Sequence, residues 1–304
     1  MNALALGVSI TGVLSAVFTS LINIFLLKNF FNANRKKEDM MLFFYRFSVD
    51  VFMGLLTALF LVCSMLFSLD MRMFAGFQRF IFFFGLPSSN LVAVRSILSL
   101  TINLERNMAA YTPIFFHNFR QRIPTFSIFL FAVSVGIFED IVLFLFCNYS
   151  FSMPEDCAAL GCAVNTCFFS YWANQKLAGF VLIFIFSLTL GVKLLYSNKF
   201  GKNTSSGLSR ANRLALLDTG IVFCFSFLPS FIANQYSHTQ FFAFQHIGPY
   251  GATAKHIGSG IEGYLVFKSL ARSRTGNLKT LPSDVSRSKI QNSQITTRKL
   301  SDVK

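Results

Sequence analysis

The segment "LSLTINLERNMAAYTPIFFHNFRQRIP", residues 98–124, begins with side chains apolar enough for a lipid bilayer and ends with charged ones. Glu105 and Arg106 are adjacent, Pro113 follows them, and Arg120 and Arg122 form a basic cluster. Charged groups are costly inside a bilayer, so this order predicts a membrane-spanning helix that ends close to Glu105. The rest of the chain has to be consistent with such a helix.

The composition indicates a membrane protein. Of the 304 residues, 53% are hydrophobic, 40 are phenylalanine and only 13% are charged, whereas soluble domains carry about 25% charged residues. The net charge of +14 comes from short basic runs between apolar stretches. That distribution is typical of cytoplasmic loops rather than of a nucleic-acid groove, and we expect no nucleic-acid partner.

Seven apolar stretches are long enough to cross a bilayer, which takes roughly 17–25 residues. They are about 3–27, 41–67, 80–104, 125–146, 177–198, 214–235 and 243–267. The last is the weakest, because it contains five glycines together with Pro249, Lys255 and Glu262. We therefore predict an all-α bundle of seven transmembrane helices over residues 1–268, followed by a disordered basic cytoplasmic tail over 269–304.

The positive charges predict the orientation. With the N-terminus outside, the predicted cytoplasmic pieces (28–40, 105–124, 199–213 and 268–304) hold 20 Lys and Arg residues. The predicted external pieces (68–79, 147–176 and 236–242) hold 3. This bias follows the positive-inside rule. The first stretch has its positive charge after it, at Lys28, so we expect an uncleaved helix rather than a signal peptide.

The longest external loop carries two signs of the secretory pathway. Asn148 begins the glycosylation sequon "NYS". Four cysteines lie in the same loop, where an oxidising compartment would pair them: Cys147, Cys157, Cys162 and Cys167. Three pairings remain open. The sequon at Asn203 falls in a predicted cytoplasmic loop, and we expect it to stay unmodified.

Glu105 and Arg106 lie where rhodopsin-like receptors carry an acid–Arg–aromatic motif. Ala109 and Pro113 also fall at the offsets of that pattern, while Asn107 replaces the aromatic residue. The resemblance implies a G-protein switch, in which the acid holds the arginine until activation frees it to meet a partner. The alternative is an ion pair that only marks a helix end.

The sixth stretch contains "FCFSFLP", residues 223–229, which resembles the activation hinge of the same receptors. Pro229 removes an intrahelical hydrogen bond and can kink the helix, so that its inner end can swing. Phe227 would be the aromatic lever. An ordinary packed and kinked helix remains the alternative.

A longer match is more specific. The segment "LPSSNLVAVRSILSLTINLERNMAAYTPIFFHNFRQRIP" at 86–124 resembles the core of the nematode serpentine chemoreceptors, and most closely the class Srbc; "YRFSVDVF" at 45–52 and "IGPYGA" at 247–252 are similar to it as well. The resemblance implies a rhodopsin-like G-protein-coupled receptor for a small-molecule odorant or pheromone-like ligand, coupled to a heterotrimeric G protein. It further implies the plasma membrane of a sensory cilium and no enzyme activity. The last helix departs from the rhodopsin-like pattern by lacking Asn-Pro-x-x-Tyr, and the third helix lacks the usual cysteine at its outer end.

Charged residues inside the predicted spans are candidates for function, because a lone charge in a bilayer is costly. Arg95 is expected near mid-bilayer, where it would pair with a carboxylate or contact an anionic or carbonyl ligand. Arg46 and Asp50 are spaced i, i+4 and are expected to pair with each other, although Asp50 also resembles a sodium-site acid. Glu139, Asp140 and Asp218 are expected to be satisfied near the membrane interfaces.

Lys255 leaves the ligand chemistry open. It is a second candidate for the ligand pocket, and its place in the last helix resembles the retinal-binding lysine of opsins, although the spacing to Tyr264 differs by one residue. A transporter or channel is the other alternative, but the sequence has no internal repeat. No spacing is typical of a metal or cofactor site, and we expect neither. The sequence does not decide whether the protein forms dimers in the bilayer.

Overall fold

The computed structural model describes residues 3–32, 41–69, 73, 76, 78–120, 122–151, 157–200, 216–235 and 249–279. Every regular element among them is a helix. The chain divides into two compact units, residues 1–264 and residues 265–304, and the fold described below is that of the first.

Five helices are long and apolar enough to cross a membrane. They are α1 (Ala3–Asn32), α2 (Met41–Leu69), α3 (Gln78–Tyr111), α5 (Thr125–Ile141), which a π-helical turn extends to Phe146, and α7 (Thr166–Phe200). Two short helices, α4 (Pro113–Arg120) and α6 (Leu160–Ala163), lie in the connections. These long helices coincide with the first five predicted spans.

The sixth and seventh predicted spans are helical but less regular. Residues 216–222 are α-helical, a π-helical segment covers Phe223–Phe227, and α9 covers Leu228–Gln235. The seventh is α11 (Tyr250–Lys279), which begins in the first unit and continues into the second. The predicted residues 243–248 and the tail after Lys279 lie outside the described residues.

Three helix ends differ from the predicted ones. Helix α3 continues to Tyr111, so Glu105 and Arg106 lie within its last turns rather than beyond its end. Helix α7 begins at Thr166 instead of 177, so the polar residues Asn174, Gln175 and Lys176 are part of the helix. Helix α11 is helical through Lys279, so residues 269–279, which we expected in a disordered tail, are part of a helix.

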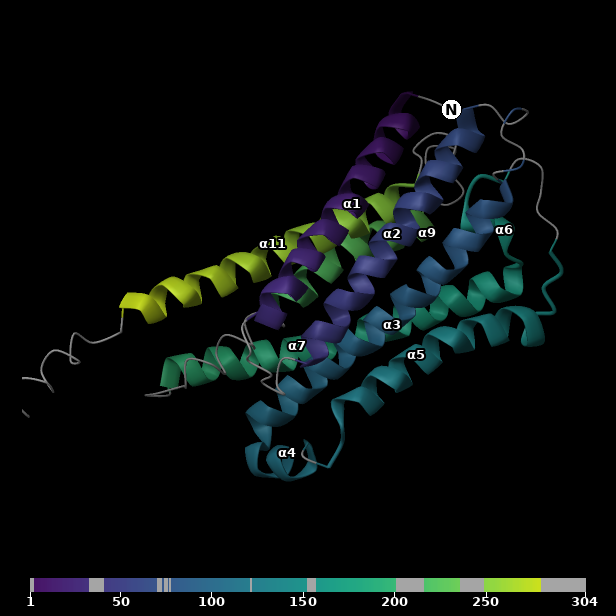
Figure 1. The fold of residues 1–304 in the computed structure, drawn as a ribbon. Helices are drawn as coiled ribbons and strands as arrows, with labels where there is room; N and C mark the ends of the chain where they lie inside the picture. Colours follow the sequence, from purple (N-terminus) through teal and green to yellow (C-terminus); the bar gives the residue numbers. More distant parts are fainter. Residues whose placement is uncertain are drawn as a thin grey trace, which may run out of the picture. The chain divides into compact units, whose positions relative to one another are not determined.

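Helix α3 is the centre of the first unit: it contacts α2, α4, α5, α6 and α7. Helices α4 and α6 lie at opposite ends of α3 (Figure 1). Glycines allow neighbouring helices to come close: a Cβ on Gly136 of α5 would lie 3.0 Å from the backbone oxygen of Asn90 in α3. On the other side of the bundle, Thr19 of α1 donates a hydrogen bond to the backbone oxygen of His256 in α11 at 2.9 Å.

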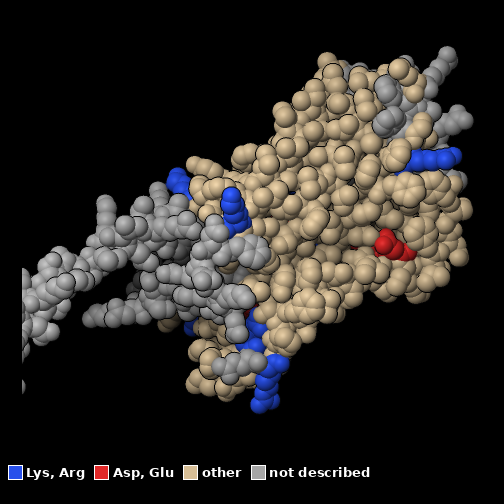
Figure 2. All heavy atoms as spheres, in the orientation of Figure 1, with Lys and Arg blue, Asp and Glu red and all other residues tan. Residues whose placement is uncertain are grey.

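The described surface is apolar along the long helices. Large hydrophobic side chains are exposed on each of them, for example Leu14, Phe52, Phe83, Leu145 and Leu188. Most of the face in Figure 2 is uncharged, and its Lys and Arg side chains lie toward the edges. A continuous apolar surface of this kind is typical of a protein whose solvent is lipid.

Candidate functional site

Two arginines and three carboxylates meet inside the first unit. We call them the ionic network: Arg46 and Asp50 of α2, Arg95 of α3, Asp218 of the sixth span, and Glu262 of α11. None of the five residues is more than 6% exposed. Helices far apart in the sequence are therefore joined through charged groups in the interior.

Arg46 is fully buried and joins α2 to two other helices. Its Nη2 atom donates a hydrogen bond to Glu262 Oε2 at 2.7 Å and a second one to Asp218. Asp50, the expected partner, also attracts Arg46, but the closest acids are Asp218 and Glu262. The i, i+4 spacing does place both side chains on one face of α2, but that face points into the bundle, where acids from other helices reach the guanidinium first.

Arg95 joins the same network from α3. Its Nε atom lies 2.6 Å from Asp50 Oδ1, and its Nη2 atom lies 2.8 Å from Glu262 Oε2. Of the two roles expected for Arg95, the structure therefore gives it the pairing with carboxylates. Glu262 contacts both arginines and is the common member of the network.

The network is stable only as a unit. Moving charges out of water costs several kcal/mol per ion, and close, hydrogen-bonded partners offset that cost. Removing one arginine would leave carboxylates buried without a counter-charge, which typically costs about 3–5 kcal/mol. The five residues in direct contact comprise two positive and three negative groups, so the loss of one acid leaves equal numbers.

Lys255, the second ligand-pocket candidate, lies on α11 near this network. It is partly buried, and it is close enough to Asp50 and Glu139 to be attracted by both. The next residue, His256, is buried, and its ring Nδ1 has no hydrogen-bond partner among the described residues. Lys255 is thus among acidic groups, but the structure assigns it no ligand.

At the opposite end of α3, Glu105 contacts a residue beyond the motif. Its Oε1 atom lies 2.6 Å from Nε of Arg120 in α4. Arg120 also donates hydrogen bonds to the backbone oxygen of Ile123 and the hydroxyl of Thr125. Pro113 is the first residue of α4, a position that suits proline because its missing N–H would have no partner there.

This contact bears on the expected partner of the acid. We expected Glu105 to hold Arg106, its neighbour in sequence, and the structure gives the acid an ion pair with Arg120 of α4. The reason is helical geometry: adjacent residues point in directions about 100° apart on a helix, whereas α4 folds back beside α3. Arg106 itself is buried, with 8% of its surface exposed.

The predicted hinge lies in an irregular part of the sixth span. The π-helical segment Phe223–Phe227 directly precedes Pro229. Phe227 stacks on Phe180 of α7, with ring centroids 3.8 Å apart and planes 11° apart. π-helical turns and prolines are the usual sites of kinks in helices. Asp218 of the ionic network precedes this segment in the same span.

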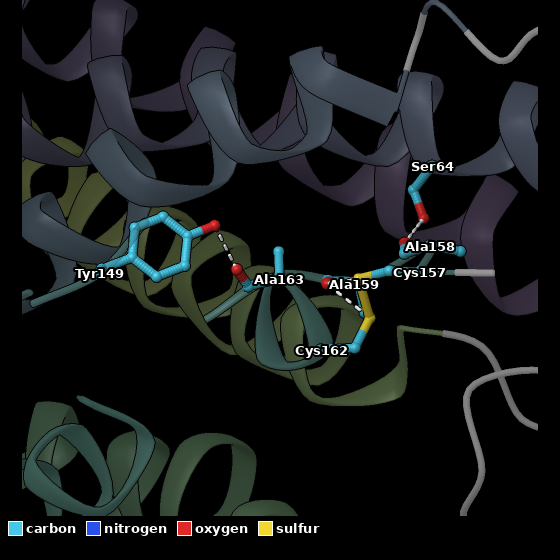
Figure 3. The surroundings of a disulfide bond; sticks show 7 residues. All are labelled: Ser64, Tyr149, Cys157, Ala158, Ala159, Cys162 and Ala163. Atoms are coloured by element: carbon cyan, nitrogen blue, oxygen red, sulfur yellow. Dashed lines mark hydrogen bonds between the residues drawn. A yellow bond between two sulfur atoms is a disulfide. The ribbon is translucent and has the colours of Figure 1, made fainter. Parts of the chain in front are cut away.

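The loop between α5 and α7 is folded into the α6 end of the bundle. Two disulfides pair all four candidate cysteines, Cys147 with Cys167 and Cys157 with Cys162. Figure 3 shows the Cys157–Cys162 disulfide and two hydrogen bonds that flank it. The hydroxyl of Tyr149 donates to Ala163 O at 2.6 Å, and the hydroxyl of Ser64 in α2 donates to Ala158 O at 2.5 Å. Ala158 also packs with Cys63, Phe67 and Ile81. We call residues 157–163 the lid. Asn148, the sequon residue, is exposed beside it.

From the sequence, Lys176 and Glu139 have no assigned function, and the structure places these two residues close to each other. Lys176 was counted with the external loop, but it belongs to α7 and its ammonium lies 3.2 Å from the ring centroid of Trp172. Glu139, which we expect near the outer membrane interface, is fully buried within the described chain. A polar run such as "NQK" at 174–176 inside a longer apolar stretch was the available signal.

Comparison with known proteins identifies one family. The family model for the serpentine type 7TM GPCR chemoreceptor Srbc matches residues 1–274. A search of curated proteins found no match. The matched range includes the ionic network, the hinge and the lid.

Proposed function

Since the chain belongs to the Srbc family of serpentine seven-transmembrane chemoreceptors, we propose that it detects a small-molecule odorant or pheromone-like ligand and activates a heterotrimeric G protein. It is a multi-pass membrane protein, and its family consists of receptors rather than enzymes. The family favours this function over the transporter, channel and photoreceptor alternatives. We further propose that it acts in the plasma membrane of a sensory cilium.

The observation that carries the proposal is the contact between Arg46 and Asp218. It fixes the sixth span to α2 just before the π-helical segment and Pro229. An outward swing about this hinge would break the contact and open the predicted cytoplasmic face. Arg106 is buried on α3 in the same half of the molecule, and we propose that it then contacts the G protein. Glu105, Arg106 and Pro113 retain their proposed role in the switch, with Arg120 added as the partner of the acid.

A bistable contact of this kind can couple a ligand to a G protein. Coupling energies between receptor sites are typically about 1–3 kcal/mol. The Arg46–Asp218 contact belongs to a network in which Arg46 keeps Glu262 when Asp218 leaves. The inactive state is therefore favoured without making the active state inaccessible.

The proposal is tested by ligand-free G-protein signalling, normalised to receptor at the cell surface. Asp218→Asn should raise this signal severalfold, as expected for a shift of roughly 1–3 kcal/mol. Folding should persist, because two arginines then face two carboxylates. Arg46→Gln should instead reduce surface delivery, since it leaves three buried acids with one arginine.

Asp140→Asn is the matched control. It makes the same chemical change on α5, where Asp140 accepts a hydrogen bond from Asn90 rather than from the sixth span. Its basal signal should equal that of the parent. A surface-expressed Asp218→Asn receptor with parental signalling would contradict the proposed mechanism.

A further inference from the structure

A small cavity lies between α3, α5 and α7, apart from the ionic network. Its lining includes Ala93, Ile97 and Leu100 of α3, Glu139 of α5, and Gln175 and Lys176 of α7. Glu139 is in the half of α5 nearer the lid, the half predicted to face outside. The lining combines an apolar wall with a few convergent polar groups, the composition of a small-molecule site.

Glu139 is the unusual member of this lining. Its residue is 0% exposed, and Ser89, Lys176 and Lys255 are close enough to interact with it. Neither carboxylate oxygen, however, forms a hydrogen bond of ordinary geometry among the described residues. Its neighbour Asp140, by contrast, accepts a hydrogen bond from Asn90 Nδ2 at 2.8 Å. Buried carboxylates are normally paired or hydrogen-bonded, so a carboxylate without either suggests that a partner is supplied from elsewhere.

The nearest cation is held by another group. Lys176 is close enough to attract Glu139 electrostatically, but its ammonium lies over the Trp172 ring and forms no ion pair with an acid of the described chain. The indole of Trp172 is itself fixed, because its N–H donates to Ser89 Oγ at 2.6 Å. The Ser89 hydroxyl, which accepts from Trp172, is left to donate toward Glu139. The acceptor capacity that remains among the described residues of the cavity is on Glu139 and on Oε1 of Gln175.

We propose that this cavity binds the ammonium group of a compact, mainly apolar amine, with Glu139 as its counter-ion. The amine supplies the donors that Glu139 and Gln175 lack, and its carbon chain lies against the apolar wall formed by α3. The inference rests on the proposed function in one respect only, namely that the amine is the ligand the receptor detects. Binding itself needs no G protein.

The test uses the full-length receptor in lipid nanodiscs at neutral pH. Three probes of equal chain length are titrated while thermal unfolding is followed: n-butylamine, 1-butanol and butyrate. A ligand that binds the folded state raises the unfolding temperature in a concentration-dependent way. Butylamine should do so at lower concentration than butanol, and butyrate should have the smallest effect.

Glu139→Gln should remove this preference for the amine. The side chain keeps its size but loses its charge, and the dissociation constant for butylamine should rise by about tenfold or more, the usual effect of losing a charge-assisted hydrogen bond. Asp140→Asn makes the same change one residue away, at a carboxylate that already has a partner, and should keep the parental preference.

Other results would overturn the proposal. If the parent does not prefer butylamine to butanol, or if Glu139→Gln keeps the preference, the cavity is not an amine site. An internal ion pair of Glu139 with Lys176 predicts that Glu139→Gln and Lys176→Met each lower the unfolding temperature without any amine effect in the parent. If the amine binds but causes no signalling, the proposed receptor function is contradicted and the amine site is not. If Asp218→Asn raises ligand-free signalling but the amine does not bind, only the amine site is contradicted.

Discussion

Asn107 occupies the position at which the receptor motif has its aromatic residue, and its amide joins two helices. The Nδ2 atom donates to the backbone oxygen of Phe186 in α7 at 2.6 Å and to Asn103 O at 2.9 Å. The Oδ1 atom accepts from the hydroxyl of Thr189 at 2.7 Å. A tyrosine has no group that could make all three contacts. The substitution that departs from the motif is thus explained by a contact between α3 and α7.

The ion pair between Glu105 and Arg120 leads to the first prediction. Glu105→Gln and Arg120→Gln should each raise ligand-free G-protein signalling severalfold, if the pair favours the inactive state by roughly 1–3 kcal/mol. The side chains are 13% and 19% exposed, so solvent weakens the pair only in part. The double variant should signal no more than either single one, because both remove the same contact.

Arg122→Gln is the control for the comparison of the single and double variants of Glu105 and Arg120. Arg122 is exposed and carries the same charge as Arg120 two residues earlier. Signalling normalised to surface receptor should match the parent. If Glu105→Gln raises the signal while Arg120→Gln does not, Glu105 acts through a different residue and the proposed pair has no part in the switch.

At the scale of elements, the sixth span combines a stiff aromatic stack with a weak backbone. Phe227 stacks on Phe180, and the rings of Phe223 and Phe231 lie 5.8 and 5.7 Å from its own. The backbone beneath these rings is π-helical and then carries Pro229, which cannot donate to the preceding turn. The stack keeps the span against α7 while the backbone can bend.

Stiffening this backbone should oppose activation. Pro229→Ala restores an N–H that can bond to the carbonyl of Phe225 in a straight helix, worth about 1 kcal/mol. In the Asp218→Asn background, basal signalling should therefore fall by about fivefold. Leu228→Ala, at an exposed residue of the same turn, should leave it unchanged. Equal signalling with and without Pro229 would show that the span does not bend there.

Prediction from the sequence succeeded for these elements where the signal was local. Apolar length identified the five long helices of the described chain. The "FCFSFLP" segment singled out Phe227 and Pro229, whose role as a hinge stays a prediction. The π-helical turn has no such signal. The spacing of Arg46 and Asp50 is a property of one helix and placed both in the network. The closer partners of Arg46, Asp218 and Glu262, could not be predicted, because they reach it through the packing of distant segments. The start of α7 was missed because the polar run 174–176 looked like a loop, and the contact of the Lys176 ammonium with the Trp172 ring has no signal in the composition.

At the scale of the whole molecule, the lid and the charge bias predict the same topology. The N-terminus and the α5–α7 loop are expected outside, and the basic loops inside. Asn148 lies exposed next to the disulfide-bonded Cys147. Both sequence features of the secretory pathway therefore meet at one end of the first unit.

This topology predicts a single glycan. Asn148→Gln should increase the electrophoretic mobility of the mature receptor and remove its sensitivity to a glycosidase. Asn203→Gln should change neither, because its sequon is expected in the cytoplasm. An N-terminal tag should be accessible on intact cells, while a tag after Lys304 should require permeabilised cells. A glycan on Asn203, or a parental mobility after Asn148→Gln, would contradict the assignment.

The burial of the ionic network has a consequence for the solvent. The five side chains are linked by four ion pairs, and none of the five residues is more than 6% exposed. When Asp218 moves away from Arg46, each of the two loses an opposite charge that offset the cost of its burial. Water molecules must then enter to hydrate both groups. Activation is then a net uptake of water as well as a movement of a helix. Solutes too large to enter the opening lower the water activity, and they therefore favour the resting state, which binds fewer water molecules. The sensitivity of the receptor to its ligand then depends on the water activity of the surrounding medium.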